Sequence, residues 1–353
     1  VARVRLIQGL FTPDPRAARL RCQPWTRELG GWSPCWYSPW LSGRLSSRPW
    51  HPVLDRMHRR LTLGICVALT GVLGAAVPGW SATDVSLESS VLCTIEDPRL
   101  VEISGITSSI RHANVVWVHN DSSDAARIYG LDLDSCAVVA EVDLRGVSAR
   151  DIEGIAAARD PRGRPVLWIG DIGDNRDTWP DVGVYRIREP AELGSTSRKA
   201  REYRFTYDDR PHNAETVMVA EDRIWIATWQ LASGGLYELP GLTGKRDRDS
   251  VLLGNRVGDV GSLITDGAIA PDASGYVLRD YLDVHFFQGP PPGRKIATLP
   301  MPAQPQGEAV TWTPDGSALL TASEGDNRIL RVEIPWWVRA GMRPPDHLVT
   351  SVS

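Results

Sequence analysis

The sequence lacks the short motifs that mark several enzyme classes. It has no Gly-x-Ser-x-Gly nucleophile elbow, no His-Glu-x-x-His zinc motif and no Cys-x-x-Cys pair. Those motifs are typical of α/β-hydrolases, zinc metalloproteases and thiol redox proteins. No glycine-rich loop opens a helix, which argues against a phosphate-binding loop. Local motifs therefore assign no reaction to the chain.

Basic residues are scarce beyond residue 82. That region holds 28 Lys and Arg against 40 Asp and Glu, so its net charge is near −12, whereas the whole chain carries −4. A surface of this charge repels nucleic acid and anionic lipid and attracts cations. We therefore expect no nucleic-acid partner.

Long apolar runs are also missing, and the longest predominantly apolar one, residues 61–77, has 17 residues. That is at the short end for a bilayer span. It follows Met57, His58, Arg59 and Arg60 and precedes small residues and a Pro-Gly, which is the order of a secretory signal peptide over residues 57–82. Residues 1–56 hold five of the 14 Trp and no Lys, and show no periodicity. They are interpreted as an untranslated or disordered extension; a genuine extension that makes the run a signal anchor is the alternative.

The signal peptide leads to a prediction about the exported protein. We expect cleavage to leave a mature N-terminus between Val77 and Asp84, a secreted or extracytoplasmic location and no stable membrane insertion afterwards. Mass spectrometry of the exported protein checks this. Any peptide from residues 1–50 would show that the extension is translated and retained.

Only two cysteines, Cys93 and Cys136, follow residue 82. Two cysteines in an exported chain favour one disulfide. Two separate buried thiols are the alternative.

Five segments beyond residue 82 repeat a short apolar strand that opens with an acidic residue followed by a small one. They are EISGITSS from Glu102, DIEGIAAA from Asp151, NAETVMVA from Asn213, ITDGAIAP from Ile264 and QGEAVTWT from Gln306. A second strand and, after a polar turn, a third follow each of them, and most units have a fourth. Four short strands in units of roughly 40–60 residues indicate a β-propeller.

The predicted fold is all-β: a propeller of four-stranded antiparallel blades over residues 83–336, followed by a C-terminal tail at 337–353. The repeat count gives five blades if the N-terminal strand SSVLCTI closes the ring by completing the last unit. A sixth blade is the alternative, from a degenerate unit in residues 177–210 or after Ile334. Aromatic residues of the second and third strands should pack blade against blade.

The segments CTIEDPRLVEISGI, VHNDSSDAARIYGLD, IEGIAA with WIGDIGDNR, YDDRPHNAETV and QGEAVTWTPDG also carry a resemblance. Together, from about Cys93 to Ile334, they resemble a family of secreted actinobacterial β-propeller proteins of unassigned activity. That family is distantly similar to lactonase, gluconolactonase and phytase-like esterase propellers. The resemblance implies the fold and export, and the two cysteines look like the family's pair. It implies no particular reaction.

One mouth of the propeller channel should be crowded with carboxylates. Consecutive strands of a blade are antiparallel, so first strands begin and second strands end on the same face. The first-strand starts supply Glu102, Asp151, Glu153, Glu215, Asp266 and Glu308; the second-strand ends supply Asn120, Asp121, Asp171, Thr228, Asp280, Ser323 and Glu324. Protons, an arginine such as Arg279 or a hard cation must compensate such a cluster.

Oxygen ligands favour Ca²⁺ over zinc. The predicted metal ligands are Glu153, Glu215, Asp266 and Glu308, with Asp171, Asp280 and Glu324 behind them. The alternative is a channel plugged by water and internal hydrogen bonds. The repeated GDNR at residues 173–176 and 325–328 is interpreted as turn backbone with Asx hydrogen bonds.

Two function classes follow from this mouth. The first is an exported, monomeric binding or interaction protein whose Ca²⁺-bearing face recognises an extracellular ligand or envelope partner. The second is a Ca²⁺-dependent hydrolase of a lactone, ester or phosphoester, with His119 or His212 as general base. A purely structural cation is a third possibility. The absence of a convincing histidine pair or nucleophile favours the first.

Overall fold

The computed structural model describes residues 87–121, 124–240 and 250–342. The expected extension at 1–56 and signal peptide at 57–82 lie outside these residues and stay predictions. Within the described ranges, no helix is both long enough and apolar enough to cross a membrane.

The described strands pair as antiparallel units of four. The first unit consists of β2 (Ile103–Ser108), β3 (Val115–Asn120), β4 (Arg127–Asp132) and β5 (Val138–Arg145). The second consists of β6 (Ile152–Arg159), β7 (Pro165–Asp171), β8 (Val182–Arg188) and β10 (Arg201–Tyr207). The third consists of β11 (Ala214–Ala220), β12 (Arg223–Thr228), β13 (Gly234–Leu239) and β14 (Leu252–Val260).

Two further units complete the set. The fourth consists of β15 (Asp266–Ile269), β16 (Gly275–Arg279), β17 (Asp283–Gln288) and β18 (Arg294–Pro300). The fifth consists of β19 (Gln306–Trp312), β20 (Ala318–Glu324), β21 (Asp326–Glu333) and β1 (Ser89–Thr94). The predicted β-propeller is confirmed, and the strand pairing divides into five four-stranded units.

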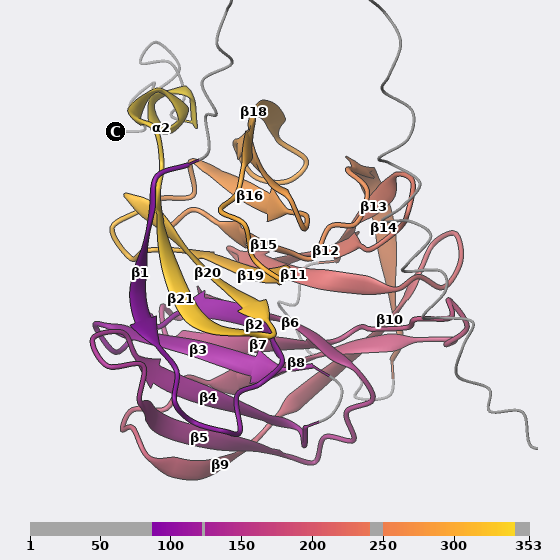
Figure 1. Cartoon of the computed structure of the whole chain (residues 1–353). Helices are drawn as coiled ribbons and strands as arrows, with labels where there is room; N and C mark the ends of the chain where they lie inside the picture. The colour runs from indigo at the N-terminus through magenta and orange to yellow at the C-terminus, as the bar shows by residue number, and fades with distance from the viewer. Residues whose placement is uncertain (1–86, 122–123, 241–249, 343–353) are drawn as a thin grey trace, which may run out of the picture. The chain divides into compact units, whose positions relative to one another are not determined.

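The N-terminal strand closes the ring. β1 lies antiparallel to β21, so the indigo strand lies beside the yellow one in Figure 1. The first strands of the units, β2, β6, β11, β15 and β19, contact one another in a closed cycle. We call these the inner strands, because they surround the central channel.

Two outer strands also link neighbouring units. β9 (Ser195–Lys199) lies between β8 and β10 in the sequence but pairs parallel to β5 of the first unit. β14 pairs parallel to β10, which joins the second and third units into one eight-stranded sheet. Residues 177–210, considered above for a sixth blade, therefore supply β8, β9 and β10.

The hydrophobic core lies between the units. Trp117 of the first unit packs in one cluster with Ile155 of the second, and Trp168 of the second packs in another with Val217 of the third. Every residue of β3 is buried, whereas β1 at the outer edge is mostly exposed. A strand covered on both faces needs a continuous apolar run, and an outer strand does not. The predicted aromatic packing between blades is confirmed.

One disulfide joins Cys93 and Cys136, whose Cα atoms are 5.5 Å apart. Cys93 lies in β1 and Cys136 in the turn between β4 and β5, so the bridge fastens the closing strand to the first unit. The predicted pairing is confirmed, and separate thiols are excluded. A disulfide of this kind is typical of an oxidising compartment.

A short helix, α2 (Trp336–Met342), follows β21. Val338 and Met342 are buried against the core of the fourth and fifth units, while Trp336 and Trp337 are exposed. The first part of the expected C-terminal tail is therefore helical, and residues 343–353 lie outside the described residues.

Candidate functional site

A β-bulge lies at the start of four of the five inner strands. The register shifts occur at Ser104, Glu153, Glu215 and Glu308, each of which is the extra residue opposite the second strand. A bulge bends its strand and re-aims the side chain of the extra residue. Three of the predicted ligands, Glu153, Glu215 and Glu308, therefore share this backbone feature at one end of the channel, which we call the acidic mouth.

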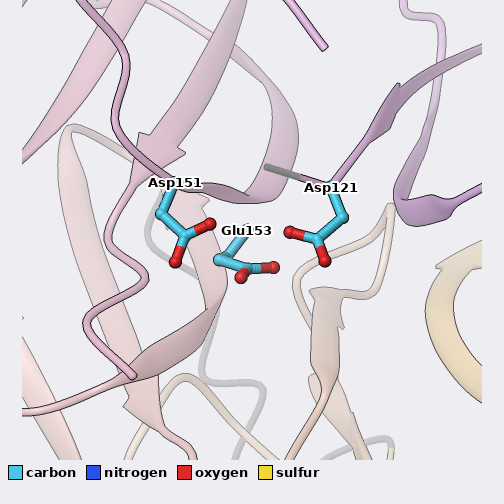
Figure 2. A group of neighbouring side chains, drawn as sticks. All are labelled: Asp121, Asp151 and Glu153. Carbon is cyan, nitrogen blue, oxygen red and sulfur yellow. The ribbon is translucent and has the colours of Figure 1, made fainter. Parts of the chain in front are cut away.

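Three carboxylates converge at the acidic mouth. Asp121, Asp151 and Glu153 each offer one oxygen, and these atoms all lie within 4.8 Å of one another. Asp121 follows β3, Asp151 precedes β6, and Glu153 is the bulge residue of β6. Figure 2 shows the three side chains turned toward one another. We call this group the carboxylate triad; it could hold a metal ion.

Burial and mutual repulsion raise the pKa values of two bulge carboxylates. The pKa of Glu153 lies well above its ordinary value, first because the side chain is buried and then because Glu215 and Asp121 are negatively charged. Burial, followed by the charge on Glu308, also raises the pKa of Glu215. The hydrogen bond that Ser104 Oγ donates to Glu153 Oε2, at 3.1 Å, opposes the shift without cancelling it.

Two further carboxyl groups are shifted into the physiological range. Burial, with added repulsion from Asp121, raises the pKa of Asp151 to about 6. Burial also raises the pKa of Glu308 to about 7; a hydrogen bond from Gln306 opposes this shift and the charge on Glu324 adds to it. Near neutral pH the acidic mouth therefore retains protons unless another positive charge takes their place.

Asp171, a predicted ligand, positions the triad. Its Oδ1 accepts the backbone N–H groups of Arg150 and Asp151, both at 2.8 Å. Its Oδ2 accepts a hydrogen bond from Tyr185 at 3.2 Å. Asp171 therefore holds the loop from which the Asp151 carboxylate projects.

Asp266, another predicted ligand, joins two units. Its Oδ1 accepts the N–H of Gly267 and its Oδ2 accepts the N–H of Val310, both at 2.7 Å. Val310 lies in β19, so the carboxylate bridges adjacent inner strands. Burial raises the pKa of Asp266 well above its ordinary value despite these bonds.

Arg279 supplies a buried positive charge beside Asp266. Its Nη1 donates to Ala309 O at 3.2 Å and its Nη2 to Gln304 Oε1 at 2.8 Å. A Cβ on Gly307 would lie 1.6 Å from Nη2, so only glycine leaves room for the guanidinium. Its charge lowers the pKa values of Asp266 and Glu308, but less than burial raises them. The expected arginine therefore compensates only part of the cluster.

The remaining two predicted ligands also have internal partners. Asp280 accepts two backbone N–H groups of its own turn, and its Oδ2 lies 3.0 Å from His285 Nε2. Burial alone would raise the pKa of Asp280, but these hydrogen bonds outweigh it and lower the pKa. Gln306 Nε2 donates to both Glu308 and Glu324, so it links the inner strand to the end of β20.

His119 is fully buried against Gly105. A Cβ on Gly105 would lie 2.2 Å from its Nε2, so the ring occupies the space that any larger residue would need. Its Nδ1 lies 2.9 Å from the carbonyl oxygen of Asn120, which requires the proton on Nδ1. Burial lowers the pKa of His119 and favours the neutral ring.

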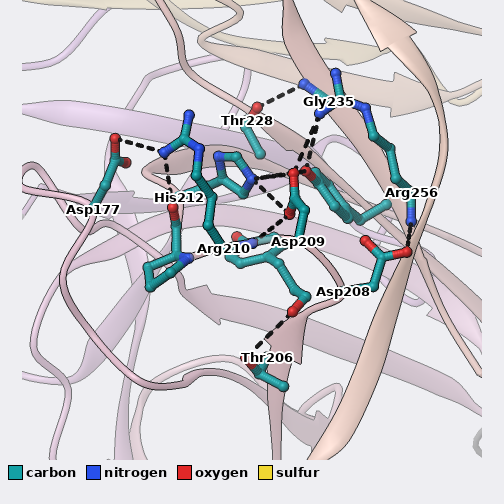
Figure 3. A network of polar contacts seen from close by, with 12 residues as sticks. Asp177, Thr206, Asp208, Asp209, Arg210, His212, Thr228, Gly235 and Arg256 are labelled. Carbon is teal, nitrogen blue, oxygen red and sulfur yellow. Dashed lines mark hydrogen bonds and ion pairs between the residues drawn. The ribbon is translucent and has the colours of Figure 1, made fainter.

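His212 belongs to a separate polar network (Figure 3). Its Nε2 lies 2.9 Å from Asp209 Oδ1 and 2.7 Å from the Tyr237 hydroxyl. Tyr237 donates to Asp209 at 2.9 Å and accepts from Arg256 at 3.2 Å. The carboxyl group that His212 contacts is therefore Asp209, which is not a member of the triad.

The turn interpretation of the GDNR repeats is confirmed for residues 173–176, whereas residues 326–328 of the second copy begin β21. Asp174 Oδ2 accepts the backbone N–H groups of Thr178 and Trp179, both at 2.6 Å. In the second copy, Asp326 accepts the N–H of Arg328 at 3.1 Å and forms an ion pair with its side chain.

The predicted metal set contains one triad member, Glu153. Sequence reasoning placed Asp121 and Asp151 at the mouth but left them outside that set. One sequence signal could have found the triad. An acidic residue, Asp121, directly follows the second strand of the first unit, and two carboxyl groups two residues apart, Asp151 and Glu153, begin the second unit. Comparison of the repeats missed this signal, because Asp121 and Asp151 do not occupy the repeat position that Glu153, Glu215 and Glu308 share.

No protein-family model and no curated protein sequence matches the chain. Similar solved structures include a PQQ-bound aldose sugar dehydrogenase from Streptomyces coelicolor, at 12% identity and a TM-score of 0.41 over 70% of this chain and 98% of that one. A gluconolactonase from Xanthomonas campestris is 10% identical, with a TM-score of 0.40 over 71% of this chain and 88% of that one. These neighbours are β-propellers. Likenesses this distant assign no activity to the chain.

Proposed function

We propose that the protein is an exported binding protein whose acidic mouth holds a divalent cation, Ca²⁺. The observation that carries the proposal is the triad, in which three carboxylate oxygens from two units lie within 4.8 Å of one another. Glu153 of the triad and its neighbours Glu215 and Glu308 have raised pKa values, so an added positive charge would stabilise the acidic mouth. A cation would replace the protons that these groups otherwise retain.

The donor set favours calcium over zinc or magnesium. All triad ligand atoms are carboxylate oxygens, which suit hard cations. Ca²⁺ accepts about six to eight oxygen ligands in flexible geometry, whereas Mg²⁺ demands near-octahedral geometry and gives up its water ligands reluctantly. A cluster of protein carboxylates therefore favours Ca²⁺ over Mg²⁺.

Apolar and aromatic residues on the same face support a binding role. Trp229 Nε1 donates to the Tyr281 hydroxyl at 3.3 Å, and burial followed by the charge on Glu215 raises the pKa of Tyr281. The aromatic pair therefore lies beside the carboxylates. Leu231 and Leu282, on the adjoining second-to-third-strand turns, are 80% and 75% exposed. A partner that combines cation contacts with stacking or apolar contacts fits this surface.

The hydrolase of a lactone, ester or phosphoester is the second candidate, because a metal at a carboxylate mouth can activate water. The two expected bases weaken it: His119 is buried behind Gly105, and His212 contacts Asp209. A panel of lactone, ester and phosphoester substrates, with and without chelator, tests this candidate. Chelator-sensitive turnover would favour it over pure binding.

Calorimetry tests the cation directly. Chelator-treated protein titrated with CaCl₂ should bind about one Ca²⁺, and more weakly Mg²⁺. Glu153→Gln and Asp151→Asn should each weaken binding at least tenfold, because each removes a triad charge. Wild-type protein without a calcium-binding isotherm would refute the proposal.

The acidic mouth also predicts a pH dependence of stability. Asp151 and Glu308 have folded-state pKa values of about 6 and about 7, above the ordinary 3.8 and 4.5. Their contribution is therefore fully present below the ordinary values and is lost as pH rises through the folded-state values. In chelator, the free energy of unfolding should fall between about pH 4 and pH 7, by up to about 1.4 kcal/mol per pH unit for each proton released.

Urea denaturation at pH 4.5, 6 and 7.5 measures this slope. Saturating calcium should flatten it, because the cation replaces the protons. Stability that rises with pH in chelator would contradict the account of the mouth.

A further inference from the structure

A cavity lies at the opposite end of the channel from the acidic mouth. It is a cavity of about 880 Å³, lined by the second halves of all five inner strands and by the hairpin turns that follow them. Sites for small organic ligands usually occupy about 300–1,000 Å³. We call it the hairpin-face cavity.

The wall of this cavity is built mainly from small and apolar side chains. β6 contributes Ile155 and three consecutive alanines, residues 156–158, and β11 contributes Val217 to Ala220. Small residues on inner strands leave the channel wide at this end. Ile269, which is half-buried, supplies a larger apolar surface, and the buried side chains of Met218 and Trp312 lie behind the wall.

Most polar side chains in the wall already have protein partners. Ser108 Oγ donates to Trp312 O at 2.7 Å, and Trp312 Nε1 donates to Ala268 O at 3.0 Å. Thr107 Oγ1 accepts the N–H of Ala157 at 3.0 Å. Because these bonds are made within the protein, little side-chain hydrogen bonding is left to hold ordered water or to recognise a highly polar ligand.

The charges around the cavity disfavour an anion. On the channel side, the carboxyl-bearing Glu153 and Glu215 precede the lining residues Ile155 and Val217 by two positions on the same strands. At the rim, the lining holds three acidic residues, Asp160, Glu221 and Asp222, against one basic residue. That residue, Arg159, donates to Gly163 O at 3.0 Å. An anionic ligand would meet acidic groups at both ends.

We propose that the hairpin-face cavity binds an uncharged, largely apolar organic molecule. The volume accommodates a molecule of drug-like size, the small and apolar side chains of the wall favour apolar contacts, and the excess of acidic groups disfavours anions. This site is distinct from the acidic mouth, and its occupancy does not depend on the cation.

A matched pair of fluorescent probes tests the proposal on the full chain. N-phenyl-1-naphthylamine is neutral, and 8-anilinonaphthalene-1-sulfonate has the same ring system with an added sulfonate. The neutral probe should bind saturably at one site, at least tenfold more tightly than the sulfonate. Its affinity should be the same in calcium and in chelator.

Two substitutions that fill the cavity should weaken neutral-probe binding at least tenfold. Ala220→Trp adds bulk at the end of β11, where Ala220 is half-buried. Ala157→Leu adds bulk deeper in the wall, on β6. Ala191→Trp adds the same bulk at an exposed site outside the lining and should leave binding unchanged. Glu221→Lys should strengthen sulfonate binding while leaving the neutral probe unaffected.

Circular dichroism and the melting temperature establish that each variant is folded before its binding is compared. Absence of saturable binding by folded wild type would overturn the inference, as would equal affinity in wild type and Ala220→Trp. A sulfonate that binds as tightly as the neutral probe would overturn the assignment of ligand charge.

Discussion

Removing calcium should lower the melting temperature of the wild-type protein by about 5–10 °C. A ligand at a hundredfold excess over its Kd stabilises the folded state by about 2.7 kcal/mol. For a domain of this size, each kcal/mol of unfolding free energy corresponds to a shift in melting temperature of about 2–4 °C. Differential scanning calorimetry at pH 7.5, with calcium and with chelator, measures the shift.

Glu153→Gln should raise the melting temperature in chelator but reduce the gain that calcium brings. Glu153→Gln removes a buried charge that Glu215 and Asp121 repel, so in chelator at pH 7.5 the variant should melt higher than wild type. In calcium it should gain less than half of the wild-type increment, because a ligand is missing. A variant that merely damages the fold would melt lower in both conditions.

Asp326→Asn is the matched control. Asp326 is the first residue of β21 and pairs with Arg328, outside the triad. Its calcium-dependent gain should equal that of wild type. If chelator leaves the wild-type melting temperature unchanged, the mouth is a protonated cluster and the cation proposal fails.

Loss of the disulfide should have the second large effect. Cys93 and Cys136 are separated by 43 residues, and closing a loop of that length stabilises a protein by about 4 kcal/mol in the chain-entropy model, within a typical range of about 2–4. The double variant Cys93→Ser with Cys136→Ser should therefore melt about 5–15 °C lower. Scanning calorimetry without reductant measures the difference.

The position of the bridge sharpens this prediction. β1 completes the fifth unit, and the disulfide fastens it to the first. In the double variant, amide hydrogen exchange should accelerate in β1 and β21 more than in β12 of the third unit. Unchanged melting, or uniform acceleration over all units, would contradict a role in ring closure.

The fold was predictable because its signals are local and repeated. The apolar strands, polar turns and recurring acidic-small pair each lie within a few residues, and their repetition indicates a propeller. Closure by SSVLCTI also followed from counting, since the last unit lacked an outer strand. The exchange of β9 into the first unit was not predicted, because parallel pairing between distant strands has no local sequence signal.

The candidate site was predictable only in outline. The repeats correctly brought Glu153, Glu215 and Glu308 to one end of the channel, where their charges interact. They did not separate the carboxylates that meet one another from those that accept backbone N–H groups. Asp171 and Asp266 belong to the same acidic pattern, but backbone N–H groups occupy them.

By itself, the sequence determined the repeat, the closing role of the N-terminal strand and the acidic character of one face, because these depend on residue type and spacing along the chain. Only the tertiary structure decided which carboxylates meet. The bulges at the inner-strand starts and the packing of the first unit against the second bring Asp121 to Asp151 and Glu153. Those distances depend on register and on contacts between units that no short stretch of sequence encodes. The hairpin-face cavity has the same origin, since its volume is set by how five inner strands are spaced around one axis.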